Sequence, residues 1–130
     1  RFHNFILNNS KELIEKLGLP YRVVLVCSGD LGLGQVKKHD IECWMPSRDA
    51  YGETHSCSSF YDFQSRRSKI RVKAKNGSLY FPFTLNNTAI ASPRIFIPIL
   101  EMNQKPDGTV KIPEVLVPYM NGIEYIKPKK

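Results

Sequence analysis

Alternation of polar and apolar residues in the middle of the chain is the feature that most restricts its fold. It runs through residues 38–45, 53–59, 70–75 and 79–83, and such alternation indicates half-buried strands. Asn76-Gly77 separates the last two stretches, and Asn-Gly between alternating runs is the strongest short signal for a β-hairpin. The middle of the chain is therefore predicted to form antiparallel strands.

The two ends of the chain carry helical patterns. Residues 2–17 repeat apolar side chains at helical spacing. Residues 90–100 suit a buried helix that Pro98 kinks or ends, and residues 112–120 indicate a proline-punctuated helix or loop. The β-branched apolar run 21–27 predicts a buried strand. The fold class predicted is α+β, an antiparallel sheet with flanking helices.

Length and charge restrict the class of protein further. A chain of 130 residues is enough for one domain. Its formal net charge of +7 favours a polyanionic partner such as a nucleotide or RNA, although part of the excess is a lysine-rich tail. No apolar run is long enough to cross a bilayer, so no membrane partner is expected. The chain starts at Arg1 rather than Met, which suggests a fragment or a processed product.

The cysteines favour neither disulfides nor zinc. Cys27, Cys43 and Cys57 are odd in number and widely spaced, which argues against a disulfide framework. There is no CxxC pair, and the sequence offers no two further ligands to join His39 with Cys43 or His55 with Cys57.

Two polar segments are candidates for a functional site. Residues 51–67 combine an acid, hydroxyls, an imidazole, a thiol and two arginines, and residues 84–94 lead from hydroxyls and amides to a lone arginine. Such segments are poor material for a core, so the two are predicted to line one pocket. Strict alternation predicts that Glu53, His55, Cys57 and Ser59 share one face of a strand.

Five stretches of the sequence form an ordered set of motifs: KKHDIECWMP at 37–46, ETHSCSSFYDFQSRR at 53–67, TLNNTA at 84–89, SPR at 92–94 and IPEVLVPY at 112–119. In this order they resemble the motifs of seryl-tRNA synthetase, a class II aminoacyl-tRNA synthetase. The similarity extends from the first helix to Ile126.

The resemblance implies an enzyme that activates serine with ATP to seryl-adenylate and transfers the seryl group to tRNA-Ser. It implies a homodimer in the cytoplasm, or alternatively in the mitochondrial matrix. By the same resemblance ATP is bound by Glu53, Thr54, His55, Ser56 and Arg94, Mg²⁺ by Glu53 and Ser56, and serine by Asn86 and Thr88. Arg94 holds the place of the arginine of the third class II motif and is the catalytic candidate.

Each of these residues also has a purely structural interpretation. Glu53 would serve as a strand acid paired with Arg66 or Arg67, and Arg94 would bind a helix end or a carboxylate. For Arg66 and Arg67, contact with the acceptor end of tRNA and a structural ion pair are equally compatible with the sequence. Cys57 is expected to be structural.

Departures from the family pattern restrict the interpretation. Phe83 stands for the usual histidine, Asn87 for glycine, Ser59 for asparagine and Gly52 for arginine. The N-terminal tRNA-binding helical hairpin and the first two class II motifs have no counterpart here. Residues 1–130 are therefore expected to be the C-terminal portion of a catalytic domain, inactive or very weakly active alone.

Two other functions are compatible with the sequence. One is a non-catalytic synthetase paralogue or fragment that binds nucleotide or RNA. The other is an unrelated basic RNA-binding module that uses Phe81 and Phe83 as stacking platforms.

Overall fold

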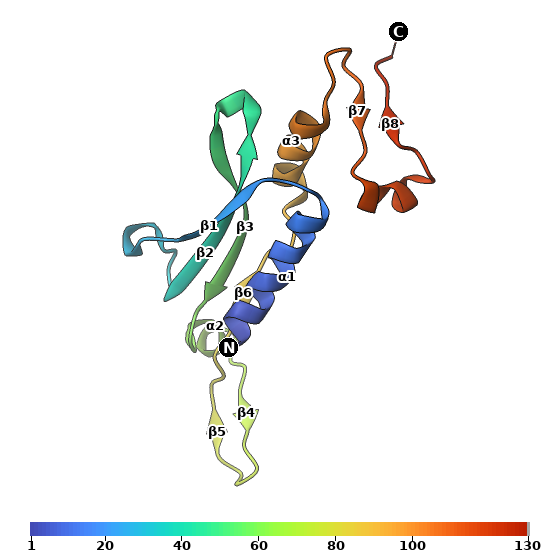
Figure 1. The fold of residues 1–130 in the computed structure, drawn as a ribbon. Helices are drawn as coiled ribbons and strands as arrows, with labels where there is room; N and C mark the ends of the chain where they lie inside the picture. The colour runs from blue at the N-terminus through green and yellow to red at the C-terminus, as the bar shows by residue number, and fades with distance from the viewer. Residues whose placement is uncertain (130) are drawn as a thin grey trace.

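The computed structural model describes residues 1–129 and has an antiparallel sheet flanked by helices (Figure 1), which confirms the α+β class. Four strands form the main sheet in the order β1-β2-β3-β6, and two small hairpins, β4–β5 and β7–β8, stand apart from it. The elements are α1 (Phe2–Lys16), β1 (Tyr21–Leu25), β2 (Lys37–Met45), β3 (Ala50–Ser59), α2 (Phe63–Arg67), β4 (Val72–Lys73), β5 (Leu79–Tyr80), β6 (Leu85–Asn87), α3 (Ser92–Asn103), β7 (Val110–Lys111) and β8 (Tyr125–Ile126).

The core lies between the two long helices and one face of the sheet. Ile14 of α1 and Ile95 of α3 belong to one buried cluster with Ile41 and Cys43 of β2 and Cys57 of β3. On β2 the predicted alternation is confirmed, because Ile41, Cys43 and Met45 are buried while Glu42 and Trp44 remain partly exposed. One face of the sheet is thus occupied by the core, and the other is free to carry a site.

Strand β1 corrects one prediction. The run from residue 21 to 27 was expected to be a buried strand, but β1 ends at Leu25, and Val23 and Leu25 are exposed. The reason is topological: β1 is an edge strand paired with β2 alone, and β-branched composition does not distinguish an edge strand from a central one.

Most of the predicted turns and helices are confirmed. The Asn76-Gly77 hairpin is confirmed, with Val72 opposite Tyr80 and Gly77 at φ +85°. Helix α3 begins only at Ser92 and continues through the buried Pro98, so this proline does not end it. The pairing of β7 with β8 was not predicted, whereas residues 114–120 form the expected helical turn as a 3₁₀ helix.

Within residues 1–129, no helix is both long and apolar enough to cross a membrane.

Candidate active site

A β-bulge in β3 determines which side chains reach the open face of the sheet. Ile41 of β2 lies opposite His55, but the next residue, Glu42, lies opposite Glu53, so Thr54 is an extra residue without a partner on β2. A bulge of this kind shifts the alternation of the strand by one residue. Residues before and after Thr54 therefore follow opposite parity.

The bulge brings Glu53 and Ser56 to the same face. Residues opposite one another in an antiparallel pair share a face, and Glu53 lies opposite Glu42 while Ser56 lies opposite Asp40. Asp40 and Glu42 are two residues apart on β2, so all four side chains belong to one face. Without the bulge, residues three apart such as Glu53 and Ser56 would point to opposite faces.

This arrangement contradicts the prediction that Glu53, His55, Cys57 and Ser59 share a face. His55 and Cys57 lie opposite Ile41 and His39 on the core side, and both are buried, whereas Glu53 is on the open side. The prediction was wrong because it assumed strict alternation through the bulge.

Strand β6 adds the two proposed serine-binding residues to the open face. Asn86 lies opposite Ser58 of β3, which shares the face of Ser56. The chain continues to Thr88, whose backbone N–H donates to the carbonyl of Ser56 (3.1 Å). Asn86 and Thr88 are both exposed, so their side chains are free for a ligand.

Arg94 reaches this site from the first turn of α3. Its Nη1 donates to Oε1 of Glu53 at 2.8 Å. Glu53 therefore pairs with Arg94 and not, as the structural interpretation had it, with Arg66 or Arg67. Pro93 also lies in the first turn of α3, where a helix tolerates proline and presents unpaired N–H groups and a positive dipole end.

A cavity of about 290 Å³ joins these groups. It is lined by Glu53, His55, Ser56, Thr88, Ala91, Pro93 and Arg94. Two polar segments far apart in the sequence thus line one cavity, as predicted, and the five predicted residues Glu53, Ser56, Asn86, Thr88 and Arg94 lie together on or beside the open face.

Thr54 and His55, the other two predicted ATP-binding residues, have side chains committed to the interior. Thr54 is fully buried, and its hydroxyl donates to the carbonyl of Ile41 (3.2 Å) and contacts Nδ1 of His55 (2.8 Å). The geometry therefore gives the Thr54 hydroxyl a structural role that stabilises the bulge. Burial lowers the pKa of His55, which favours the neutral form of its imidazole.

A second group of charges lies beside the cavity on the same face. Lys38 and Asp40 form an ion pair at 3.0 Å. Both line one hollow together with Glu42 and Glu53. Burial, followed by the nearby Glu53 and Glu42, raises the pKa of Asp40 against the effect of its bond to Lys38. Asp40 and Glu42 thus lie beside the cavity formed around Glu53.

The unusual Asn87 has a structural explanation. It lies opposite Cys57 on the core side, where its Nδ2 donates to the carbonyl of Ile6 (2.7 Å) and to Oγ of Ser10 (2.9 Å) in α1. Phe83, the other departure in this segment, is exposed and packs against Tyr61 with ring centroids 5.0 Å apart. Neither side chain lines the cavity beside Glu53.

The remaining candidates are mostly structural. Arg66 forms the ion pair that one interpretation predicted, with Asp62 at 2.8 Å, while its guanidinium also lies over the Phe81 ring. Cys57 is buried, and burial raises the pKa of its thiol to about 11, as expected of a structural cysteine. Among residues 1–129 no cluster of three or more His, Cys, Asp or Glu side chains is arranged to hold a metal ion.

The stretch of chain that forms this sheet and its two long helices is similar to a known class of domain. The family model for the tRNA synthetase class II core domain (G, H, P, S and T) matches residues 4–103, and the chain belongs to this family.

Comparisons with known proteins are more specific and confirm the resemblance to seryl-tRNA synthetase. The chain is 50% identical over 121 residues to a serine–tRNA ligase of Deinococcus radiodurans, covering 93% of this chain and 28% of the relative. It is 49% identical over 123 residues to that of Fervidobacterium nodosum, covering 95% of this chain and 29% of the relative.

Solved structures that match this chain belong to the same family. Seryl-tRNA synthetase from Pyrococcus horikoshii complexed with ATP matches with a TM-score of 0.93 and 44% identity, over 99% of this chain and 29% of that one. Cytoplasmic serine–tRNA ligase from Naegleria fowleri in complex with AMP matches with a TM-score of 0.88 and 38% identity, over 99% of this chain and 30% of that one. The chain thus spans less than a third of the length of these relatives.

Proposed function

We propose that these residues form part of the active site of a serine–tRNA ligase. Such an enzyme joins serine to ATP as seryl-adenylate, releases pyrophosphate, and passes the seryl group to tRNA-Ser. The reaction needs no protein nucleophile, so the side chains act by positioning and by stabilising charge. The observation that carries the proposal is the contact between Glu53 and Arg94 in one cavity with Ser56 and Thr88.

Arg94 and the start of α3 suit the triphosphate. A guanidinium presents several donors in a plane and remains charged at any physiological pH. It projects from the first turn of a helix, where the dipole favours anions. Arg94 is half exposed in its pair with Glu53, so it can turn to a phosphate without leaving a buried charge unpaired.

Glu53 and Ser56 suit Mg²⁺. The ion prefers oxygen ligands and is usually held by one or two carboxylates together with substrate phosphates, so the open face does not need a dedicated acidic cluster. The bulge gives the carboxylate of Glu53 and the hydroxyl of Ser56 a common face. When bound there, the ion would supply positive charge against the phosphate oxygens.

Asn86 and Thr88 suit the amino acid. Their amide and hydroxyl groups are exposed beside Ser56 and can bond the polar groups of serine. A site that bonds the serine hydroxyl discriminates strongly against alanine, because alanine leaves its polar groups unpaired. Asn87 and Phe83 point elsewhere, so these two departures leave this part of the pocket unaltered.

Calorimetric titration with a non-hydrolysable seryl-adenylate analogue in the presence of Mg²⁺ tests the proposal. Binding is expected to weaken in Glu53→Ala, which removes the partner of Arg94, and in Thr88→Ala. Glu42→Ala is the matched control: it removes a carboxylate from the same face that pairs with Arg22 at 2.6 Å, outside the cavity. Equal binding by all three variants would contradict the assignment.

The full activity is proposed for a protein that provides the remaining substrate contacts. We propose that residues 1–130 are the C-terminal part of its catalytic domain, and that the enzyme works as a homodimer in the cytoplasm or, alternatively, the mitochondrial matrix. The 130-residue chain by itself is expected to lack serine-dependent ATP–pyrophosphate exchange. Measurable exchange by this chain would overturn that expectation.

A further inference from the structure

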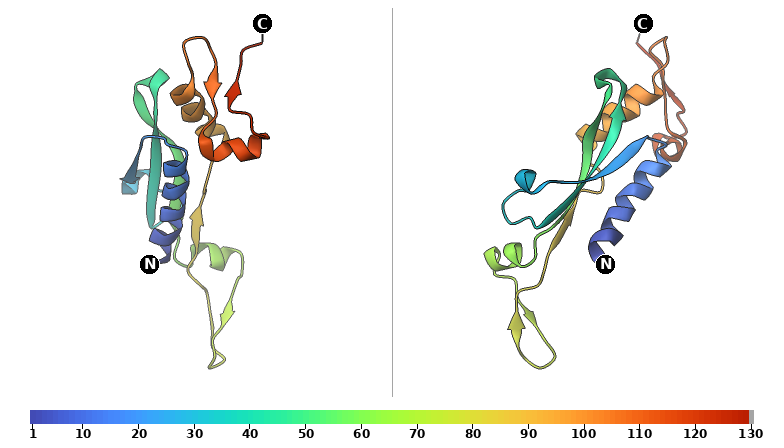
Figure 2. Two further views of the ribbon diagram at one scale, coloured as in Figure 1. Left: turned by 45° about the vertical axis from the view of Figure 1, so that its right-hand side comes forward. Right: turned by 60° about the vertical axis from the view of Figure 1, so that its left-hand side comes forward.

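We propose that residues 66–83, here called the basic arm, bind the phosphate backbone of the RNA whose end enters the site. The arm comprises the end of α2 and the β4–β5 hairpin, and it projects away from the body of the molecule (Figures 1 and 2). The identity of the RNA as tRNA-Ser depends on the proposed function. The binding surface itself is argued from the arm alone.

Most of the net charge of the protein is concentrated in this arm. Six of the 19 lysine and arginine residues lie between Arg66 and Lys75, and no Asp or Glu occurs between Asp62 and Glu101. All six cationic residues are exposed. Of the six, only Arg66 has an ion pair within the part of the chain that the structure describes. A surface of this kind favours a polyanion strongly.

The register of the hairpin puts Arg71 and Lys73 on one face. Lys73 lies opposite Leu79, and alternation places Arg71 on the same side. Lys75 follows in the turn at the tip of the hairpin. The Phe81 ring confirms this arrangement, because the guanidinium of Arg71 lies 5.3 Å and that of Arg66 4.7 Å from its centroid. The other side carries apolar residues, with Val72 opposite Tyr80.

The spacing of this row suits a nucleic-acid backbone. Alternate residues of a strand are about 6.6 Å apart, so Arg71 and Lys73 present charges at this interval, and Lys75 adds a third at the tip of the hairpin. Aromatic rings lie near the cations: the Phe81 ring contacts Arg66 and Arg71, and Tyr80 lies on the other side of the hairpin. Tyr61, Tyr80 and Phe83 are all exposed, and RNA-binding surfaces use such rings to stack unpaired bases. These aromatics favour RNA over an anionic membrane or an acidic protein.

The arm is connected directly to the cavity. It leaves the sheet after β3 and returns as β6, and Ser59 lies opposite Leu85 where the two strands join it. Ser56 and Thr88 lie three residues from that junction, a distance of about 10 Å along a strand. An RNA strand held on the arm therefore has its end beside the cavity that contains Glu53 and Arg94.

Fluorescence anisotropy with a labelled tRNA-Ser transcript, titrated with the 130-residue chain at several salt concentrations, tests the inference. The arm variant combines Arg71→Gln, Lys73→Gln and Lys75→Gln. It is expected to bind at least about tenfold more weakly, with a log–log salt slope smaller by about 2 to 3.

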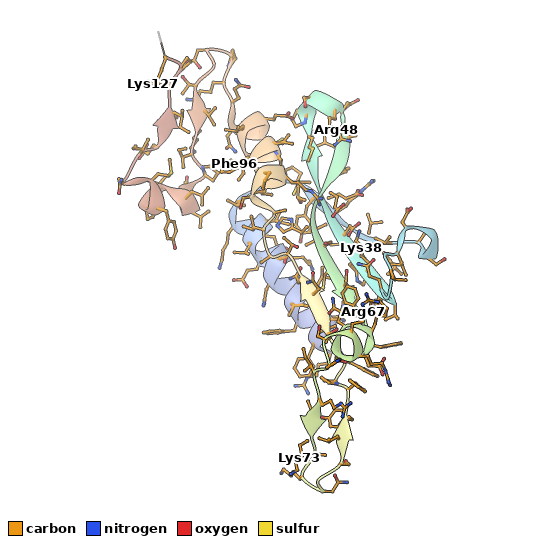
Figure 3. The ribbon with its side chains drawn as sticks, turned by 180° about the vertical axis from the view of Figure 1, so that it is seen from behind. Lys38, Arg48, Arg67, Lys73, Phe96 and Lys127 are labelled. Atoms are coloured by element: carbon orange, nitrogen blue, oxygen red, sulfur yellow. The ribbon has the colours of Figure 1, made fainter. Side chains whose placement is uncertain are left out.

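Two controls test whether RNA binding depends on the position of the cations or only on the net charge of the chain. The end variant combines Lys105→Gln, Lys127→Gln and Lys129→Gln and loses the same charge; Lys127 lies at the opposite end of the molecule from Lys73 (Figure 3). It is expected to weaken binding by less than about threefold. The swap variant combines Arg71→Val with Val72→Arg and Lys73→Ala with Ala74→Lys. It keeps composition and charge but turns two cations to the other face, and it is expected to lose affinity like the arm variant.

The outcomes distinguish this inference from the proposed function. Loss of RNA binding in the arm and swap variants but not in the end variant supports the arm, whether or not the chain binds the seryl-adenylate analogue. Equal loss in the arm and end variants, or unchanged binding by the swap variant, overturns it. Calorimetry with the analogue on the same preparations reports on the proposed function independently, because none of these substitutions lies in the cavity.

Discussion

The hydrogen bonds of Asn87 connect the site-bearing strand to α1, and their removal is expected to destabilise the fold measurably. Asn87→Ala removes donors to the carbonyl of Ile6 and to Oγ of Ser10, at 2.7 and 2.9 Å. A hydrogen bond contributes about 1 kcal/mol net, and a buried polar group left unpaired costs about 1–3 kcal/mol. The hydroxyl of Ser10 is fully buried and would lose this partner.

Together these terms predict a loss of about 2–3 kcal/mol in the free energy of unfolding. Urea titration followed by circular dichroism measures it, because a slope of about 2 kcal/mol per molar converts the loss into a midpoint lower by about 1 M or more. Asn86→Ala is the control. Its neighbouring amide is exposed on the opposite face of β6, so a change within about 0.5 kcal/mol is expected.

A double variant makes the test sharper. Removing both partners leaves neither unpaired, so Ser10→Ala combined with Asn87→Ala is expected to cost less than the two single changes added together. If Asn87→Ala proves as mild as Asn86→Ala, or if the two changes are strictly additive, the attribution of stability to this contact is wrong.

Two further predictions concern acid stability and turns. All three histidines have pKa values lowered from 6.5, mainly by burial. The unfolded chain therefore binds protons more readily, and the free energy of unfolding should fall as the pH drops from 7.5 to 5.5. Unfolding midpoints that do not change over this range would contradict this prediction. Gly77→Ala should lower the free energy of unfolding by only about 1 kcal/mol, because the new Cβ meets open space and only the strain of φ +85° remains. Gly34→Ala should lower it clearly more, because its Cβ would overlap the ring of Phe63. Equal thermal midpoints for the two variants would refute this difference.

Features governed by local chemistry could be predicted from the sequence. Asn76-Gly77 specifies its hairpin because glycine adopts positive φ without strain, and Gly18 ends α1 at φ +69° for the same reason. Pro93 is tolerated where it stands because the first turn of α3 has no hydrogen bond for it to break. In each case a few adjacent residues contain the whole cause.

Features that depend on residues far away in the sequence could not be predicted from the sequence. The bulge at Thr54 arises because β2 and β3 must each place their own core residues in the interior. The sequence of residues 53–59 alone does not predict it. The amide of Asn87 meets α1 some eighty positions away in sequence. The exposure of β1 follows from its place at the sheet edge, which only the assembled topology determines.

The extra residue at position 54 lets Glu53 point to the open face while Cys57 points to the core. In a regular strand, two residues four apart would share one face. Upstream of it, odd positions such as Glu53 belong to the solvent side; downstream, odd positions such as Cys57 belong to the interior. If Thr54 were paired regularly with β2, the Glu53 carboxylate would turn inward or the core thiol would turn outward, and no choice of register could satisfy both. Substitutions before and after the bulge can therefore change the interior and the open face independently of one another.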